Sequence, residues 1–151
     1  MRIVIQRVGE AGVCVDGEVK GEIGKGMMVL VGVEVGDTLE DAEWLAKKTA
    51  GLRIFSDDEG VMNLSIGQVD GEVLAISQFT LMASTRKGNR PSYVRAAGHE
   101  LAVPMYEAYC RMLGEQIGKV VKKGVFGADM QVSLVNDGPV TIIMDSRQKE
   151  F

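Results

Sequence analysis

Hydroxyl and amide side chains gather at the end of one apolar run of this chain. Residues 77–80 are Ser77-Gln78-Phe79-Thr80, directly after the run Val73-Leu74-Ala75-Ile76. At a strand end, main-chain N–H groups beside such side chains can stabilise the oxyanion that forms when an ester carbonyl is attacked. Spacing alone favours a plainer role, in which these polar groups satisfy the neighbouring backbone.

The apolar and aromatic residues of this region predict a strand over Val73–Leu81. Side chains alternate between the faces of a strand. The prediction therefore places Ser77, Phe79 and Leu81 on one face and Gln78 and Thr80 on the other.

Positive charge follows this strand without any acidic counterpart. No Asp or Glu occurs from Val73 to His99, although the chain has 21 acidic residues and a net charge of -4. The cations in this stretch are Arg86, Lys87, Arg90 and Arg95. The stretch is either a solvated basic loop or a local patch that binds phosphates.

Other kinds of site find little support in the sequence. The single histidine, His99, is predicted at the start of a helix, so a surface or capping role is favoured over a Ser-His-Asp triad. Cys14 and Cys110 lie far apart and form no Cys/His cluster, which predicts buried free thiols and neither a disulfide framework nor a zinc site. The segment Gly21–Gly26 lacks the residues of a phosphate-binding P-loop and is interpreted as a turn between strands.

A proline interrupts the end of the chain. The segment NDGPVT (136–141) lies between apolar alternations over Met130–Val135 and Val140–Asp145. Asn-Asp-Gly predicts a hairpin turn joining these two strands. The proline after the glycine removes one hydrogen-bond donor, which a strand edge tolerates.

These segments must be positioned by strands and helices that the sequence also predicts. Strand-like alternation occurs over Arg2–Val8, Gly12–Val15 and Val19–Ile23, with Asp16-Gly17 as a turn, and further strands are expected over Met27–Val35 and Leu52–Phe55. One helix begins after Asp37-Thr38, ends at Gly51 and buries a face of Leu39, Ala42, Leu45, Ala46 and Thr49. A second spans about 98–118 and has Met105, Tyr109, Met112, Leu113 and Gln116 along one face, with Pro104 near its first turn.

Length and composition agree with this organisation. At 151 residues, 46% hydrophobic and 25% charged, the chain is expected to form one domain over residues 1–151. No apolar run approaches the ~20 residues that a membrane span needs, so a cytoplasmic protein is expected. The predicted fold is α+β, with a mostly antiparallel, barrel-like sheet and two main helices.

Four segments together resemble the D-aminoacyl-tRNA deacylase family. They are MRIVIQRV at the start, SQFTL at 77–81, TRKGNRPS at 85–92 and FGADMQVSLVNDGPVT at 126–141. The resemblance spans essentially the whole chain. Two residues depart from the family pattern: Met82 stands where an aromatic residue is common, and Ser84 where an acidic residue is common. Both are expected at the pocket rim or on the approach of the tRNA.

The resemblance implies a hydrolase in translation quality control. Such enzymes cleave the ester that joins a D-amino acid, or glycine mischarged onto tRNA-Ala, to the terminal adenosine of tRNA, and they use no cofactor. It also implies a homodimer in which a cis Gly138-Pro139 peptide, held by Arg7, enters the partner's site and faces Ser77, Gln78, Phe79 and Thr80. L-aminoacyl esters would be rejected because their side chain finds no space there.

The same resemblance admits chemistry without a side-chain base. The 2′-hydroxyl of the terminal ribose is expected to orient the attacking water, while N–H groups near Phe79 and Thr80 bind the oxyanion. A covalent Thr80 nucleophile is the weaker alternative, because no base can be named for it. Under this interpretation Arg86, Lys87 and Arg90 contact tRNA phosphates or the dimer interface. A non-catalytic RNA-binding module and a metal-independent hydrolase of small esters remain as alternative functions.

Overall fold

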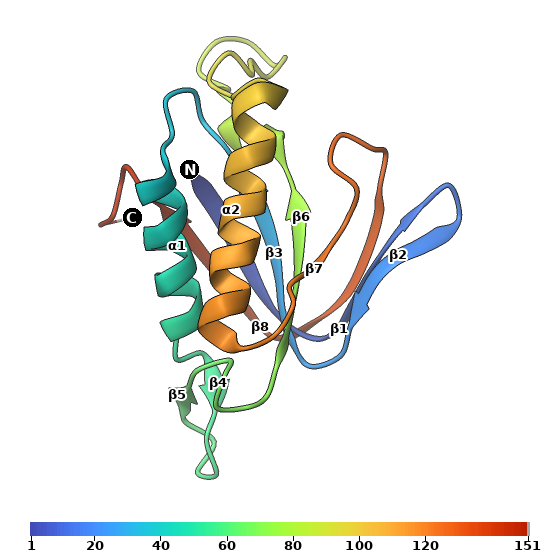
Figure 1. Ribbon diagram of the computed structural model, residues 1–151, viewed down its shortest axis with the longest axis vertical. Helices are drawn as coiled ribbons and strands as arrows, with labels where there is room; N and C mark the ends of the chain where they lie inside the picture. The colour runs from blue at the N-terminus through green and yellow to red at the C-terminus, as the bar shows by residue number, and fades with distance from the viewer. Residues whose placement is uncertain (151) are drawn as a thin grey trace.

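The computed structural model describes residues 1–150 as a curved six-stranded sheet with two helices on one face, and a separate two-stranded sheet of β4 and β5 (Figure 1). The elements in chain order are β1 (Arg2–Val15), β2 (Glu18–Ile23), β3 (Gly26–Gly32), α1 (Leu39–Gly51), β4 (Phe55–Ser56), β5 (Met62–Leu64), β6 (Glu72–Ser77), the 3-10 turn η1 (Phe79–Met82), α2 (His99–Ile117), β7 (Lys122–Lys123) and β8 (Gln131–Asp145). The α+β class and the two helices are therefore confirmed.

The sheet is built around the long strand β1. The strand order is β2-β1-β3-β6-β7, and β8 also pairs with β1. On one side β1 pairs first with β3 and then with β2, and on the other side it pairs with β8 along nearly its whole length. These pairings are antiparallel, as predicted, whereas β3–β6 and β6–β7 are parallel. Parallel neighbours need a crossover connection, and α1 and α2 lie in these two connections.

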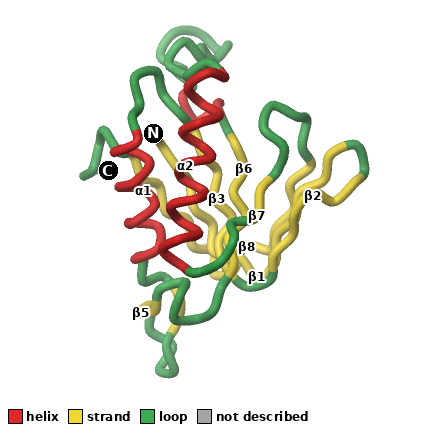
Figure 2. The backbone as a smooth tube through the Cα atoms, in the orientation of Figure 1, coloured by secondary structure: helices red, strands yellow, loops and turns green. Residues whose placement is uncertain are grey.

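Both helices begin and end at the residues that the sequence predicts. Thr38 caps α1 and forms a capping box with Asp41, while α2 lies between Gly98 and the left-handed Gly118. The two helices lie side by side over the sheet (Figure 2). The apolar face of α1 begins one turn later than predicted, because Leu39 is 55% exposed and the first buried residue is Ala42.

Polar groups inside the core are satisfied by hydrogen bonds. The hydroxyl of Tyr109 lies 3.0 Å from Thr49 Oγ1, and the Tyr106 hydroxyl donates to the main-chain oxygen of Ala75 at 2.9 Å. These bonds explain a threonine on the buried face of α1 and hold α2 on both α1 and β6. Cys110 is buried, and burial raises the pKa of its thiol to about 12. Cys110 and the half-buried Cys14 are both free thiols, as expected.

The prediction of a strand over Val73–Leu81 is wrong in its second half. Strand β6 ends at Ser77, where the N–H of Gln78 makes a last bond, 2.7 Å long, to the Val31 carbonyl. The chain then turns into η1, with Leu81 N–H bonded to the Gln78 carbonyl at 3.2 Å. Met82 is fully buried and anchors this turn on the sheet. The predicted alternation of side chains therefore does not continue past Ser77.

The predicted hairpin at NDGP is also wrong, because β8 is one strand that pairs with β1 on both sides of this segment. Asn136 is opposite Val8 and Thr141 is opposite Gln6, so residues 137–140 face Arg7 alone. The segment is thus an extended bulge rather than a turn between partners. Of the strand predicted over Leu52–Phe55, only Phe55 lies in a strand, the two-residue β4.

Candidate active site

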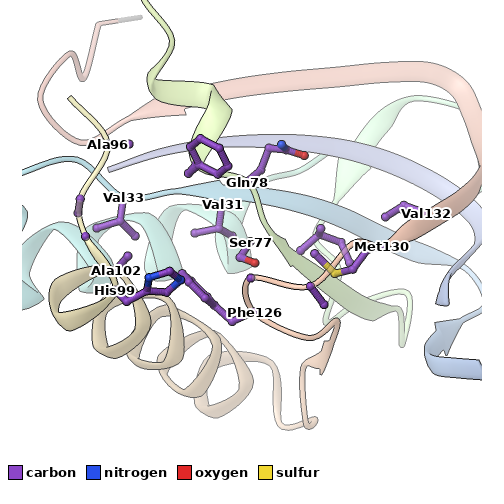
Figure 3. A pocket seen from close by; sticks show the side chains of 16 residues that line it. Val31, Val33, Ser77, Gln78, Ala96, His99, Ala102, Phe126, Met130 and Val132 are labelled. Carbon is purple, nitrogen blue, oxygen red and sulfur yellow. The ribbon is translucent and has the colours of Figure 1, made fainter. Parts of the chain in front are cut away.

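A cavity of about 540 Å³ opens where β3 and β6 end and α2 begins (Figure 3). Its wall includes Ser77, Gln78 and Phe79 from the end of β6 and the start of η1, and His99 from the start of α2. Most of the remaining lining is apolar, and it comprises Val31, Val33, Ile76, Ala96, Ala97, Gly98, Ala102, Phe126, Gly127, Ala128, Met130 and Val132. A mostly apolar cavity with a few polar groups is typical of a ligand site.

Two main-chain donors at the start of η1 are available to a ligand. Within residues 1–150, no hydrogen bond uses the N–H of Phe79 or of Thr80, whereas the neighbouring N–H groups of Gln78 and Leu81 are bonded. The first N–H groups of any helical turn lack an internal partner. Phe79 lines the cavity, whereas Thr80, the next residue, is not part of its lining.

The side chains of this turn are arranged around Gln78. Its amide nitrogen donates to Thr80 Oγ1 at 2.5 Å. In the described part of the chain this is the only hydrogen bond of the Thr80 hydroxyl, and the atom it contacts is a donor. Among residues 1–150, therefore, no group that could remove a proton is hydrogen-bonded to the Thr80 hydroxyl.

His99 lies in the cavity wall without the partners of a triad. Its ring contacts Phe126 edge-on at 5.4 Å, and among residues 1–150 it makes no hydrogen bond to Ser77 or to a carboxylate. The N-cap of α2 is Gly98, so the predicted capping role is wrong, whereas the predicted surface exposure is confirmed. The sequence-based list of site residues missed His99, Phe126 and Met130. The block FGADM before β8 was the available signal, since it carries an aromatic residue and a methionine.

The Gly138-Pro139 segment is exposed on the outer side of β8. Its peptide bond is cis, as expected, and Gly138 has a φ of +124° that favours glycine. Arg7 is bonded beside it, with Nε donating to the Asp137 carbonyl at 3.0 Å and Nη1 to the Ile54 carbonyl at 2.7 Å. The contact between Arg7 and the bulge that the resemblance implies is therefore present.

Within one chain, the Gly-Pro bulge and the Ser77–Thr80 segment are far apart. The bulge lies opposite Arg7, near the middle of β1, whereas η1 packs at the start of β1, where Arg2 contacts the Leu81 carbonyl. Arg7 lies five residue positions along β1 from Arg2, which corresponds to roughly 17 Å. Neither Gly138 nor Pro139 lines the cavity.

The basic loop lies next to η1 and is closed by a bridge between Ser84 and Ser92 (Figure 1, top). Arg86, Lys87 and Arg90 are exposed, and none of them has an ion-pair partner within residues 1–150. Arg95 differs, because its guanidinium bonds Glu34 at 2.8 Å and lowers the pKa of that carboxyl. Arg86, Lys87 and Arg90 are therefore the three cations of this loop that are not ion-paired within residues 1–150 and can bind an anion.

The two departures from the family pattern lie away from the cavity. Met82, the last residue of η1, is fully buried and does not line the cavity, so its expected place at the pocket rim is wrong. Ser84 belongs to the bridge that closes the basic loop and does not line the cavity either.

Among residues 1–150, no helix is long and apolar enough to cross a membrane, and no group of three or more His, Cys, Asp or Glu side chains is placed to hold a metal ion.

A family model and individual relatives both match nearly the whole chain. A family model described as D-Tyr-tRNA(Tyr) deacylase matches residues 4–145. Proteins named D-aminoacyl-tRNA deacylase from Parabacteroides distasonis and Flavobacterium johnsoniae are 59% and 53% identical, each over 99% of this chain and 100% of the relative.

Solved structures share the fold. One titled "c-Myc DNA Unwinding Element Binding Protein" has a TM-score of 0.89 and 38% identity, and the match covers 96% of this chain and 98% of that one. Another, titled as a probable eukaryotic D-amino acid tRNA deacylase, has a TM-score of 0.81 at 16% identity, covering 95% and 97% of the two chains. The latter likeness concerns the fold alone.

Proposed function

Because the chain belongs to the D-aminoacyl-tRNA deacylase family, we propose that it hydrolyses the ester between a D-amino acid and the terminal adenosine of tRNA. The resemblance noted in the sequence is thereby confirmed. The observation that carries the proposal is that, within residues 1–150, no hydrogen bond uses the N–H of Phe79, which lines an apolar cavity, or that of Thr80, which follows it. The cavity volume is within the range of about 300–1,000 Å³ usual for small-ligand sites.

The proposed reaction uses groups of the substrate and main-chain groups of the enzyme. The terminal adenosine occupies the apolar cavity, where Phe126 offers an aromatic surface to the base. Water, oriented by the ribose 2′-hydroxyl, attacks the ester carbonyl, and the N–H groups of Phe79 and Thr80 stabilise the oxyanion. The carbon–oxygen bond to the 3′-oxygen then breaks, and this oxygen takes up the proton that the water has lost. Ser77 and Gln78 position the ribose.

Selection against L-amino acids is assigned to the Gly-Pro bulge of a second subunit. The bulge is exposed and lies far from the cavity of its own chain, so it can complete a site only in a partner. In a two-fold homodimer each subunit would insert Gly138-Pro139 beside the partner's Ser77–Thr80 segment. The bulge leaves no room for an L side chain, whereas a D side chain projects away from it and glycine has none. Glycine mischarged onto tRNA-Ala is therefore also a substrate.

The remaining contacts of the substrate are assigned to the basic loop. Arg86, Lys87 and Arg90 are free cations next to η1, and their charges favour phosphates of the tRNA acceptor stem. Such contacts place the tRNA without reading its sequence. The proposed compartment is the cytoplasm, where aminoacyl-tRNA is made and used.

Separate incubations with D- and L-aminoacyl-tRNA test the function. The D-ester should be lost at least about 100-fold faster than the L-ester, since selection rests on steric exclusion. If the protein binds both D- and L-aminoacyl-tRNA but does not hydrolyse the D-ester, it is an RNA-binding module without catalytic activity. Equal cleavage of free D-amino-acid esters would show a hydrolase of small esters, because the tRNA would then contribute nothing.

Replacing Thr80 by alanine distinguishes the two proposed mechanisms. The substitution keeps the main-chain N–H and removes only the hydroxyl that Gln78 contacts. We expect the single-turnover rate of D-ester hydrolysis to fall by no more than about tenfold, because one neutral hydrogen bond is lost. A loss of about 10⁴-fold or more, or an acyl group trapped on Thr80 in the unchanged protein, would contradict substrate-assisted hydrolysis.

A further inference from the structure

One row of residues across three strands lies directly beneath η1. Arg2 of β1 is opposite Gly32 of β3 on one side and opposite Asp145 of β8 on the other. These residues alternate with neighbours that pack under the helices, such as Ile3 and Val31, so the row belongs to the opposite face of the sheet.

Gly32 allows η1 to lie close against the sheet. A Cβ at Gly32 would be 2.9 Å from Leu81 Cβ and 3.0 Å from the main-chain oxygen of Gln78. Those distances are shorter than ordinary contacts, and the second involves backbone that cannot swing away. A side chain at position 32 would therefore displace the turn.

Arg2 binds the far end of the same turn. Its Nη1 donates to the Leu81 carbonyl at 3.1 Å, and its Nε donates to Asp145 Oδ2 at 3.0 Å. Carbonyls at the end of a helical turn lack internal partners, so a guanidinium is a suitable donor for Leu81. Asp145 is 2% exposed and also accepts the N–H of Arg147 at 2.9 Å, which fixes its carboxylate.

We propose that Arg2 is a positioning residue for the deacylation reaction, and that it orients the Phe79 and Thr80 N–H groups by holding the Leu81 carbonyl. This inference rests on the proposed function for its consequence in catalysis, but not for its geometry. The turn is only four residues long, and its start is fixed by the bond from Gln78 N–H to Val31. The turn, which carries both donors, is therefore held at both ends. Displacement of such donors weakens oxyanion stabilisation more than substrate binding.

The test uses Arg2→Lys, which separates the two contacts of the guanidinium. An ammonium group can keep the ion pair with Asp145, but it lacks the planar fork that reaches Asp145 and Leu81 together. We expect the single-turnover rate on D-aminoacyl-tRNA to fall about tenfold, with KM unchanged within about twofold. Arg2→Met, which removes both contacts, should lose at least as much rate.

Arg147→Gln is the matched control. Arg147 is an exposed arginine at the same end of the sheet that binds Asp37, Glu34 and the Val35 carbonyl, and within residues 1–150 no hydrogen bond or ion pair joins its side chain to η1. This control should keep the wild-type rate even where its melting temperature falls as far as that of Arg2→Lys. Equal loss of rate in both variants would show a general effect of stability and would overturn the proposal.

Amide resonances provide a readout that does not depend on activity. In Arg2→Lys, the ¹H–¹⁵N shifts of Phe79 and Thr80 should change, and those of Arg147→Gln should not. Wild-type rates together with unchanged shifts at Phe79 and Thr80 in Arg2→Lys would overturn the inference. If Arg2→Met does not fold, the rate and the amide shifts of Arg2→Lys alone decide whether Arg2 positions η1. An inactive wild-type protein would refute the proposed function, while the shifts would still report whether Arg2 orients the turn.

Discussion

Gly138→Ala should abolish most deacylation of D-aminoacyl-tRNA while leaving the subunit folded. The added Cβ would lie 2.9 Å from Arg7 Nη2 and 3.0 Å from Val140 Cγ2, at a φ of +124° that L side chains rarely adopt. Relief of this clash must move either Arg7 or the bulge, and with it the Arg7 bond to the Asp137 carbonyl. A displacement of about 1 Å in a substrate-positioning element can cost about 100-fold. We therefore expect kcat/KM to fall by at least about 100-fold.

Gly9→Ala is the control for this substitution. Gly9 lies in β1 close to the bulge, and an added Cβ would meet nothing within 4 Å. This variant should keep wild-type activity. Wild-type activity in Gly138→Ala would contradict the role of the bulge, because its geometry would then not matter to the reaction.

Mixing two inactive variants tests whether the bulge acts in the partner. Gly138→Ala keeps an intact Ser77–Thr80 segment, and a variant disrupted at that segment, such as Gln78→Ala, keeps an intact bulge. Random pairing makes half of the dimers mixed, and each mixed dimer has one site with both parts intact. Activity should therefore return to about a quarter of the wild-type value. No recovery after complete subunit exchange would place the bulge and the segment in the same subunit.

Asp37→Asn should cause the largest loss of stability among single substitutions at ion pairs. Asp37 is 4% exposed, and its Oδ2 lies 2.7 Å from the fully buried α-ammonium group of Met1. The same oxygen accepts the N–H of Glu34 at 2.7 Å, while Arg147 Nη2 lies 3.0 Å from Oδ1. Neutralising Asp37 leaves a buried cation without its counter-charge, which costs about 3–5 kcal/mol.

Thermal unfolding measures this effect. For a chain of this size, such a loss corresponds to a decrease in melting temperature of roughly 10 °C. The control is Glu43→Gln, which breaks the exposed pair between Lys47 and Glu43 on α1. Exposed pairs contribute little, so this control should melt within about 2 °C of the wild type. If Asp37→Asn melts as the control does, the buried pair does not stabilise the fold.

Local sequence patterns were sufficient to predict the helices and most of the strands. Thr38 and Asp41 predict the start of α1, and Gly98 and Gly118 predict the ends of α2, because helix caps depend on residues close in sequence. Apolar alternation likewise predicts β2 and the two parts of β1, Arg2–Val8 and Gly12–Val15, which the structure joins in one strand, since burial of one face of a strand is visible as a period of two residues. Family membership also followed from the sequence, through SQFTL, NDGPVT and the order in which they occur.

Only the tertiary structure determined how the candidate site is arranged. The sequence pattern predicts a strand over Val73–Leu81, but the hydrogen-bonded pairing with β3 ends at Ser77. Within residues 1–150, the N–H groups of Phe79 and Thr80 are therefore left without a hydrogen bond. NDGP has the composition of a hairpin turn, yet both flanks pair with β1, so it becomes a bulge opposite Arg7. The cavity wall combines segments as distant as His99 and Phe126. Strand pairing and cavity walls depend on contacts between residues far apart in the chain, and the residues adjacent to a segment do not encode them.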